Sequence, residues 1–201
     1  MSFISVDLLI RNKIAEYTNS QNAISNIDLK SLSAEQIQIE QFLDANDIIY
    51  ARKIGDTGIS SSKTYTHKIS MEKFGQILFS VQGFPEKASN QKKQIFDKYY
   101  NQIFGENKFD ISKSAELVKR YFEIRKEYDN NENKYEVTDQ KIFYILYLDN
   151  ALKIDTKTKV VFFENVLKLY RNSDKISDAR KLINTKFKEK LEEEIKVFND
   201  K

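Results

Sequence analysis

The sequence has 201 residues, of which 40% are apolar and 31% charged, and its net charge is +3. This composition predicts a folded chain, and so small a net charge does not by itself indicate nucleic acid. Cysteine is absent, which excludes disulfides, thiolate metal sites and cysteine nucleophiles. No apolar run reaches the roughly 18 to 20 residues of a membrane span, and the N-terminus lacks a signal-peptide pattern. We therefore expect a cytoplasmic protein, built as a small α+β unit joined to a helical extension.

The N-terminal third predicts two helices followed by two strands. Apolar spacing predicts the first helix over about 5–17, and the amide-rich residues 18–22 (T-N-S-Q-N) end it. Ser33 and Gln36 have the spacing of a capping box, which predicts a second helix over about 34–45. Residues 48–54 and 63–69 are short and rich in β-branched and aromatic residues. We expect them to form a small hairpin around a glycine- and serine-containing loop.

The remainder of the chain predicts helices almost throughout. They run from Ser70 to Gly83, over about 90–104, from Asp110 or Ser112 to a polar break at 129–133, from Thr138 onward, over about 156–170 and over about 175–198. Residues 142–148 are nearly all apolar, so a helix buried on most sides or a core strand would both fit them. Apolar residues between Ile176 and Ile195 approach a heptad repeat, which fits either a coiled-coil seam or one stripe of a bundle.

Several segments together carry a family resemblance. They are T-N-S-Q-N at 18–22, I-D-L-K-S-L at 27–32, I-I-Y-A-R-K-x-G at 48–55, M-E-K-F-G-Q-I-L-F at 71–79, G-F-P-E-K-A at 83–88 and the run that begins at Ile95. The chain resembles the AIPR family, the abortive phage infection proteins of bacteria, over roughly residues 10–105. We therefore expect a mainly α fold with a small β-hairpin (α+β), divided into an AIPR-like α+β region at 1–105 and a helical tail or bundle at 106–201.

The resemblance implies phage defence as the setting. AIPR proteins are typically much longer, and the DNA cleavage that the family implies would belong to an upstream nuclease-like domain with acidic and lysine metal-site residues. The chain resembles the C-terminal portion that follows such a domain, as a fragment, a truncated relative or a standalone derivative. We accordingly expect a module without catalytic residues, metal or cofactor, which binds nucleic acid or positions a nuclease partner.

The candidate nucleic-acid-binding residues are five: Asn19, Gln21, Asn22, Arg52 and Lys53. Amide side chains can bind base edges or backbone groups, while the two cations can meet phosphate. The alternative is that the amides cap the first helix and that the cations are solvated. Alternation along residues 63–69 makes the single histidine, His67, as easily an exposed strand residue as a catalytic one.

Acidic residues could also be grouped on paper with Lys53 into a metal-dependent nuclease site. The candidates are Asp28, Asp44, Asp47, Asp56 and Glu72. Such a site would place an acid two residues before the lysine on its strand, but Ala51 occupies that position. No phosphate-binding glycine loop is present either, so the residues favour binding over catalysis.

Charge is uneven along the chain. Residues 153–190 contain eleven Lys and Arg against five Asp and Glu, a surplus of six, whereas residues 1–49 have a surplus of four acids. The basic segment is the better nucleic-acid candidate, and solvated helix faces are the alternative. A different class of function also fits: a protein-interaction domain, from a phage, that uses residues 153–198 to bind and inhibit a host defence complex such as a CRISPR effector.

Overall fold

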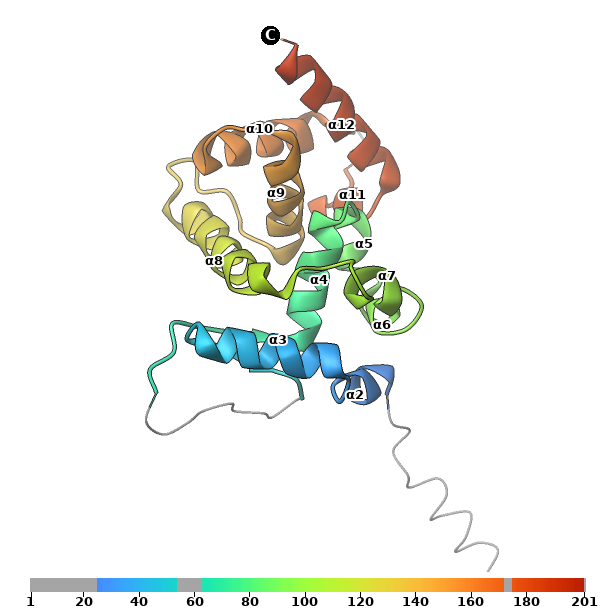
Figure 1. The fold of residues 1–201 in the computed structure, drawn as a ribbon. Helices are drawn as coiled ribbons and strands as arrows, with labels where there is room; N and C mark the ends of the chain where they lie inside the picture. Colours follow the sequence, from blue (N-terminus) through green and yellow to red (C-terminus); the bar gives the residue numbers. More distant parts are fainter. Residues whose placement is uncertain (1–24, 54–62, 172–174, 201) are drawn as a thin grey trace, which may run out of the picture.

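The structure is a computed structural model that describes residues 25–53, 63–171 and 175–200 (Figure 1). Its elements are α2 (Asn26–Lys30), α3 (Ala34–Ala45), β1 (Ile48–Ala51), β2 (His67–Ser70), α4 (Met71–Val81), α5 (Pro85–Ala88), α6 (Lys92–Ile95), α7 (Tyr100–Phe104), the 3₁₀-helix η1 (Ile111–Lys113), α8 (Ser114–Asn130), α9 (Asp139–Ala151), α10 (Thr156–Leu169), α11 (Asp178–Leu182) and α12 (Thr185–Asn199). A mainly α fold with a small β part is confirmed. The helix predicted over 5–17 lies outside the described residues.

Helix α3 spans the predicted residues, but its expected capping box does not form. Ser33 is the N-cap without a side-chain capping bond, and its hydroxyl instead lies 2.6 Å from the hydroxyl of Tyr100. Gln36 is fully buried, donates to the Tyr100 hydroxyl over 3.2 Å and accepts a 2.5 Å hydrogen bond from Tyr50. The two polar side chains therefore tie α3 to α7 and β1, because tertiary partners outcompete the local cap.

The predicted hairpin is wrong, because β1 and β2 pair in parallel. Ile48 lies opposite His67 and Ala51 opposite Ser70. The backbone N–H of Thr66 donates to the carbonyl of Asp47 over 2.8 Å, so both strands start at the same end of the sheet. Alternation and β-propensity indicate a strand but not its direction. The long connection between the strands allows a crossover, which a tight turn would have excluded.

Helix α4 is the centre of the fold and follows β2 without a loop. Ser70 is both the last residue of β2 and the N-cap of α4, and its side chain accepts a hydrogen bond from the Lys73 N–H. Helix α4 packs against α9 on one side and against α5 and α6 on another (Figure 1). Gly75 allows the close approach, since a Cβ there would lie 2.9 Å from side-chain atoms of Ile95 and Phe96.

Two predicted helices are each broken into two. The helix predicted over 90–104 is α6 and α7, whose inner rings Phe96, Tyr100 and Phe104 pack on one another. The helix predicted over 175–198 is α11 and α12, separated at Ile183 and Asn184, and the Asn184 side chain caps α12. A continuous heptad seam through this region is therefore wrong. Neither break contains glycine or proline, which is why periodicity missed them.

The buried side chains form one cluster that reaches from Ile39 in α3 to Ile195 in α12. Helix α9 lies within it, and residues 142–148 are helical, so the strand alternative is wrong. Helix α10 packs on α8, α9 and α12, α8 packs on α9, and α9 also packs on α4 and α5. The division of the chain at residue 105 stays a prediction. None of the described helices has the length and apolar character needed to cross a membrane.

Candidate nucleic-acid interface

Of the five residues proposed from the sequence, the structure describes Arg52 and Lys53, while Asn19, Gln21 and Asn22 lie outside the described residues. The guanidinium of Arg52 is engaged within the fold: its Nε lies 2.9 Å from a carboxylate oxygen of Glu40, and Nη1 donates to the Ser31 carbonyl over 2.5 Å. Lys53 is exposed. Arg52 therefore fastens β1 to α3 and the end of α2, and its role in binding nucleic acid stays a prediction.

The acids considered for a nuclease site have local partners instead. Asp28 completes a capping box with Ser25, and Glu72 pairs with Lys92 at 3.2 Å. Asp44 and Asp47 share Lys63, at 3.6 and 3.3 Å. Asp56 lies outside the described residues. Within the described part of the chain, no three His, Cys, Asp or Glu residues gather as metal ligands would.

His67 has a packing role. Its ring stacks on Phe122 with centroids 4.5 Å apart and an interplanar angle of 7°, which joins β2 to α8.

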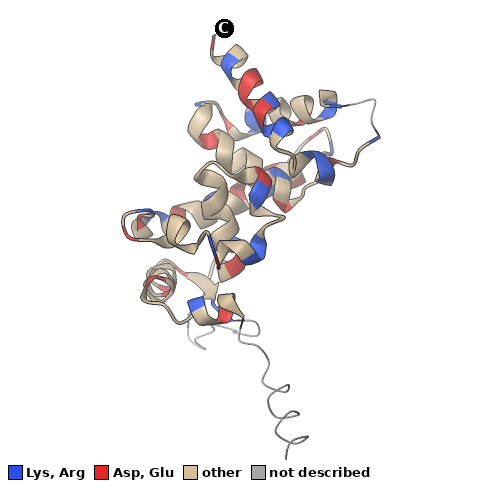
Figure 2. Cartoon of the chain, turned by 90° about the vertical axis from the view of Figure 1, so that its right-hand side faces the viewer, with Lys and Arg blue, Asp and Glu red and all other residues tan. Residues whose placement is uncertain are grey.

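The basic segment 153–190 divides into paired and unpaired cations. Six of its lysines bond to carboxylates or carbonyls: Lys153, Lys157, Lys159, Lys181, Lys188 and Lys190. Four other cations are exposed and have no carboxylate partner among the described residues: Lys168, Lys175, Arg180 and Lys186. We call these four, with Arg171, the basic corner. Figure 2 shows basic residues on both sides of the grey stretch 172–174.

A small hollow of about 160 Å³ lies in the basic corner. Its lining includes Arg171, Arg180, Asn184 and Tyr170. The guanidinium of Arg171 lies 5.5 Å from the centre of the Tyr170 ring, within the range of a cation–π contact. The Tyr170 hydroxyl is buried and has no hydrogen-bond partner within the described part of the chain. The corner thus combines cations, an amide and an aromatic ring, the groups that bind phosphates and bases. Charge counting indicated this segment, but only the structure separates its free cations from its paired ones.

An apolar groove adjoins the basic corner between α10 and α12. It has a volume of about 380 Å³, and its lining includes Phe162, Val166, Leu169 and Tyr170. Leu169 is 77% exposed, and Phe198, which packs edge-on against Phe162, is 37% exposed. Apolar side chains exposed around a groove are typical of a protein-binding surface.

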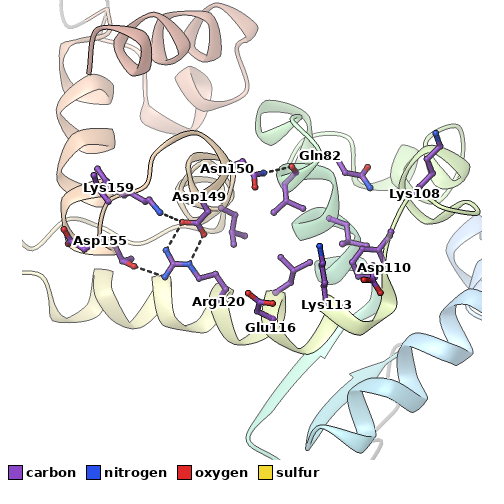
Figure 3. A pocket seen from close by; sticks show the side chains of 17 residues that line it. Gln82, Lys108, Asp110, Lys113, Glu116, Arg120, Asp149, Asn150, Asp155 and Lys159 are labelled. Atoms are coloured by element: carbon purple, nitrogen blue, oxygen red, sulfur yellow. Dashed lines mark hydrogen bonds and ion pairs between the residues drawn. The ribbon is translucent and has the colours of Figure 1, made fainter. Parts of the chain in front are cut away.

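A larger hollow of about 720 Å³ lies where α4, α8, α9 and α10 meet (Figure 3). On one side of it Asp149 accepts two hydrogen bonds from Arg120, at 2.8 and 2.9 Å, and one from Lys159, at 2.7 Å. Arg120 also donates to the Thr156 hydroxyl over 2.7 Å. These bonds hold α8, α9 and α10 together. They also fix the positions of the polar side chains on this side of the hollow.

A family model described as "AIPR protein" matches residues 1–199. The chain belongs to the AIPR family. The match extends the resemblance from residues 10–105 to nearly the whole chain, so the helical tail is part of the family region and our shorter estimate was wrong. Neither the comparison with curated proteins nor that with solved structures gave a match. AIPR membership indicates abortive phage infection as the setting of this protein.

The stability of this AIPR chain should depend on pH through the ionisation of Asp149. Burial opposes ionisation of Asp149, but hydrogen bonds from Arg120 and Lys159 outweigh it and hold the pKa of its carboxyl below the usual value. A pKa lower in the folded chain than in the unfolded one means stability that is present above about pH 4 and is lost as pH falls further. We expect Asp149→Asn to lose less stability than the wild type between neutral pH and acid, measured by urea unfolding. Asp97→Asn, which changes an exposed aspartate, should keep the wild-type loss.

Proposed function

We propose that the chain is a noncatalytic, cytoplasmic module of an AIPR phage-defence system that binds nucleic acid through the basic corner and so helps to position a nuclease partner. The observation that carries this proposal is a set of four exposed cations that have no carboxylate partner among the described residues. Arg180 lines the small hollow together with Arg171 and Tyr170, and Lys168, Lys175 and Lys186 lie within two residues of its lining in the sequence.

Phosphate chemistry explains why this group favours nucleic acid. Cations that already pair with carboxylates gain little from a phosphate, because one ion pair replaces another. Exposed cations without such a partner release counterions when they meet phosphate, which makes binding favourable and dependent on salt. Tyr170 and Asn184 add a ring that can stack and an amide that can hydrogen-bond, as in surfaces that bind single strands. Single-stranded DNA or RNA is therefore the preferred ligand class.

The test is binding of labelled single- and double-stranded DNA and RNA at several salt concentrations. We expect affinity to fall steeply between about 50 and 200 mM salt. Replacing Lys168, Lys175, Arg180 and Lys186 together by alanine should weaken binding about a hundredfold or more and flatten the salt dependence by about two to four counterions. The same protein incubated with Mg²⁺ or Mn²⁺ should not cleave the strands.

A matched control removes four other exposed lysines, Lys93, Lys98, Lys119 and Lys126, and so lowers the net charge equally. It should keep most of the affinity. Equal weakening in both quadruple variants would show that binding is a diffuse effect of net charge, and no binding at low salt would remove the proposal. Cleavage that depends on the added metal would contradict the noncatalytic role.

A second candidate function is partner binding through the helical tail, as the protein-interaction alternative from the sequence requires. The observation that favours it is the apolar groove, in which Leu169 is exposed and whose lining residue Phe162 packs against the exposed ring of Phe198. A chain that binds neither DNA nor RNA at low salt would favour this candidate over the first.

A further inference from the structure

We infer that the small hollow of the basic corner holds the terminal phosphate of a single strand, while the apolar groove beside it holds the terminal nucleoside. This inference rests on the proposed function and names the part of the nucleic acid that the corner recognises, a phosphorylated strand end. The two cavities adjoin, because Tyr170 and Arg171 line both of them. Their sizes and linings differ in the way that a phosphate differs from a nucleoside.

The small hollow has the size of one phosphate. A phosphate has four oxygens, and at roughly 30 Å³ for each, the share of one molecule in liquid water, it needs on the order of 120 Å³. The hollow has about 160 Å³, which leaves too little room for a sugar or a base as well. An internal phosphate has a sugar on both sides, whereas a terminal phosphate has a sugar on one side only. A site of this size therefore favours the end of a strand.

The lining of the small hollow is cationic. It includes three cations, Arg171, Arg180 and Lys181, and no carboxylate among the described residues. Asp178, which is outside the lining, lies 3.3 Å from the Lys181 ammonium and offsets one of these charges. Arg180 is exposed and forms no ion pair with a described residue. A terminal phosphate carries about −1.5 to −2 at neutral pH, against about −1 for an internal one, so these cations favour the terminal phosphate.

Donors reach the small hollow from three segments of the chain. Arg171 follows α10, Arg180 lies in α11, and Asn184 caps α12. The contact of Arg171 with the Tyr170 ring restrains its guanidinium. The side-chain oxygen of Asn184 accepts from the Lys186 N–H over 2.9 Å, so its amide nitrogen is the part that can donate to a ligand. A terminal phosphate offers three free oxygens to these donors, and an internal phosphate offers two.

The apolar groove has the size and the surface that a nucleoside needs. Its volume of about 380 Å³ lies within the range of small-molecule sites. Leu169 is largely exposed and Phe162 is half-buried, so a planar base can pack against both. Asn165 is exposed in the lining and supplies an amide for the edge of the base. Lys190 and Glu194 pair at 2.9 Å and add no net charge, so the groove suits an uncharged nucleoside.

The test compares short single strands of one sequence that carry an internal label and differ only at their ends. One has a 5′-phosphate, one a 3′-phosphate, one a hydroxyl group at each end, and one is circular. We expect one of the phosphorylated strands to bind the full chain about tenfold more tightly than the hydroxyl-ended strand. The circular strand should bind no more tightly than the hydroxyl-ended one. Fluorescence anisotropy at a single salt concentration measures the affinities.

Two variants separate the phosphate from the nucleoside. Arg180→Ala should lose most of the tenfold preference for the phosphorylated end, whereas Lys119→Ala, which changes an exposed cation on α8, should keep it. Leu169→Ala should weaken phosphorylated and hydroxyl-ended strands by a similar factor of about three to ten, because it removes apolar surface beneath the base. Its control is Leu32→Ala, which truncates an exposed leucine outside the groove and should bind as the wild type does.

The outcomes distinguish this inference from the proposed function. Equal affinity of the wild type for phosphorylated and hydroxyl-ended strands would overturn the inference, and the proposed function would stand if the quadruple variant of the basic corner still lost binding. A phosphate preference that survives in Arg180→Ala would also overturn the inference, since the phosphate would then lie elsewhere. A wild type that binds none of the strands would overturn both.

Discussion

Lys141→Met should lower the free energy of unfolding by about 3–5 kcal/mol, the usual cost of removing one partner from a buried ion pair. Lys141 is 5% exposed and Glu164 is 7% exposed, and their charged atoms lie 3.0 Å apart. Tyr128 donates a further hydrogen bond to Glu164 over 3.1 Å. Methionine has a similar volume to lysine, so the lost stability measures the cost of leaving the Glu164 carboxylate buried without its partner. Urea unfolding at neutral pH measures it.

Two comparisons distinguish this cause from a packing defect. Burial already raises the pKa of Glu164 above its ordinary value, despite the hydrogen bonds from Lys141 and Tyr128. A pKa raised in the folded chain makes the native state bind a proton before the unfolded state does, so the deficit of Lys141→Met should shrink as pH falls from about 7 to about 5. Adding Glu164→Gln should restore more than half of the loss. A deficit that is independent of pH and unchanged in the double variant would contradict this account.

Phe187→Ala should lower the free energy of unfolding by about 3–5 kcal/mol, as large truncations in a packed core do. Phe187 is fully buried at the start of α12. Its ring packs against Tyr144 of α9 at 5.2 Å, against Phe163 of α10 at 6.1 Å and against Tyr170 at 5.2 Å. The truncation opens a cavity where three elements meet, and thermal and urea unfolding should both show the loss.

Phe198→Ala is the control on the same helix. Phe198 is 37% exposed and packs on Phe162 alone among the described rings. Its truncation should cost less than half as much, because less surface leaves water and the site can collapse. Similar losses in the two variants would show that α12 as a whole, and not the ring cluster at its start, carries the stability.

The sequence predicted the elements better than their pairing. Helix α3 runs over the predicted residues 34–45, and α4 ends before Gly83 as predicted, because polar N-caps and apolar spacing are local signals. The direction of β2 is not local, since it depends on the path taken between the strands. The breaks within 90–104 and 175–198 were missed because tertiary packing and the Asn184 cap, rather than glycine or proline, end those helices.

In the candidate site, too, local features of the sequence could be predicted, whereas contacts between distant residues could not. The surplus of cations in 153–190 could be counted from the sequence, and the role of this segment in binding stays a prediction. The ion pair of Arg52 with Glu40 could not be predicted, because Glu40 comes from α3 and meets Arg52 only when α3 packs on β1. In the basic segment, pairs such as Lys159 with Asp149 join different helices, so the free cations become known only when the paired ones are assigned. The hollow lined by Lys113 and Gln82 had no sequence signal, since its residues come from segments far apart in the chain.

The direct junction of β2 and α4 at Ser70 has a consequence for how chain length can vary in this protein. Each residue of a helix turns the following ones by about 100°. One residue inserted between Ser70 and Met71 would therefore keep the strand pairing only by rotating α4, which would carry Phe74, Ile77 and Leu78 away from α9. The register of the sheet and the orientation of the central helix therefore cannot change independently. Insertions and deletions should be strongly selected against at this joint, because they would separate the strand pairing from the packing of the central helix.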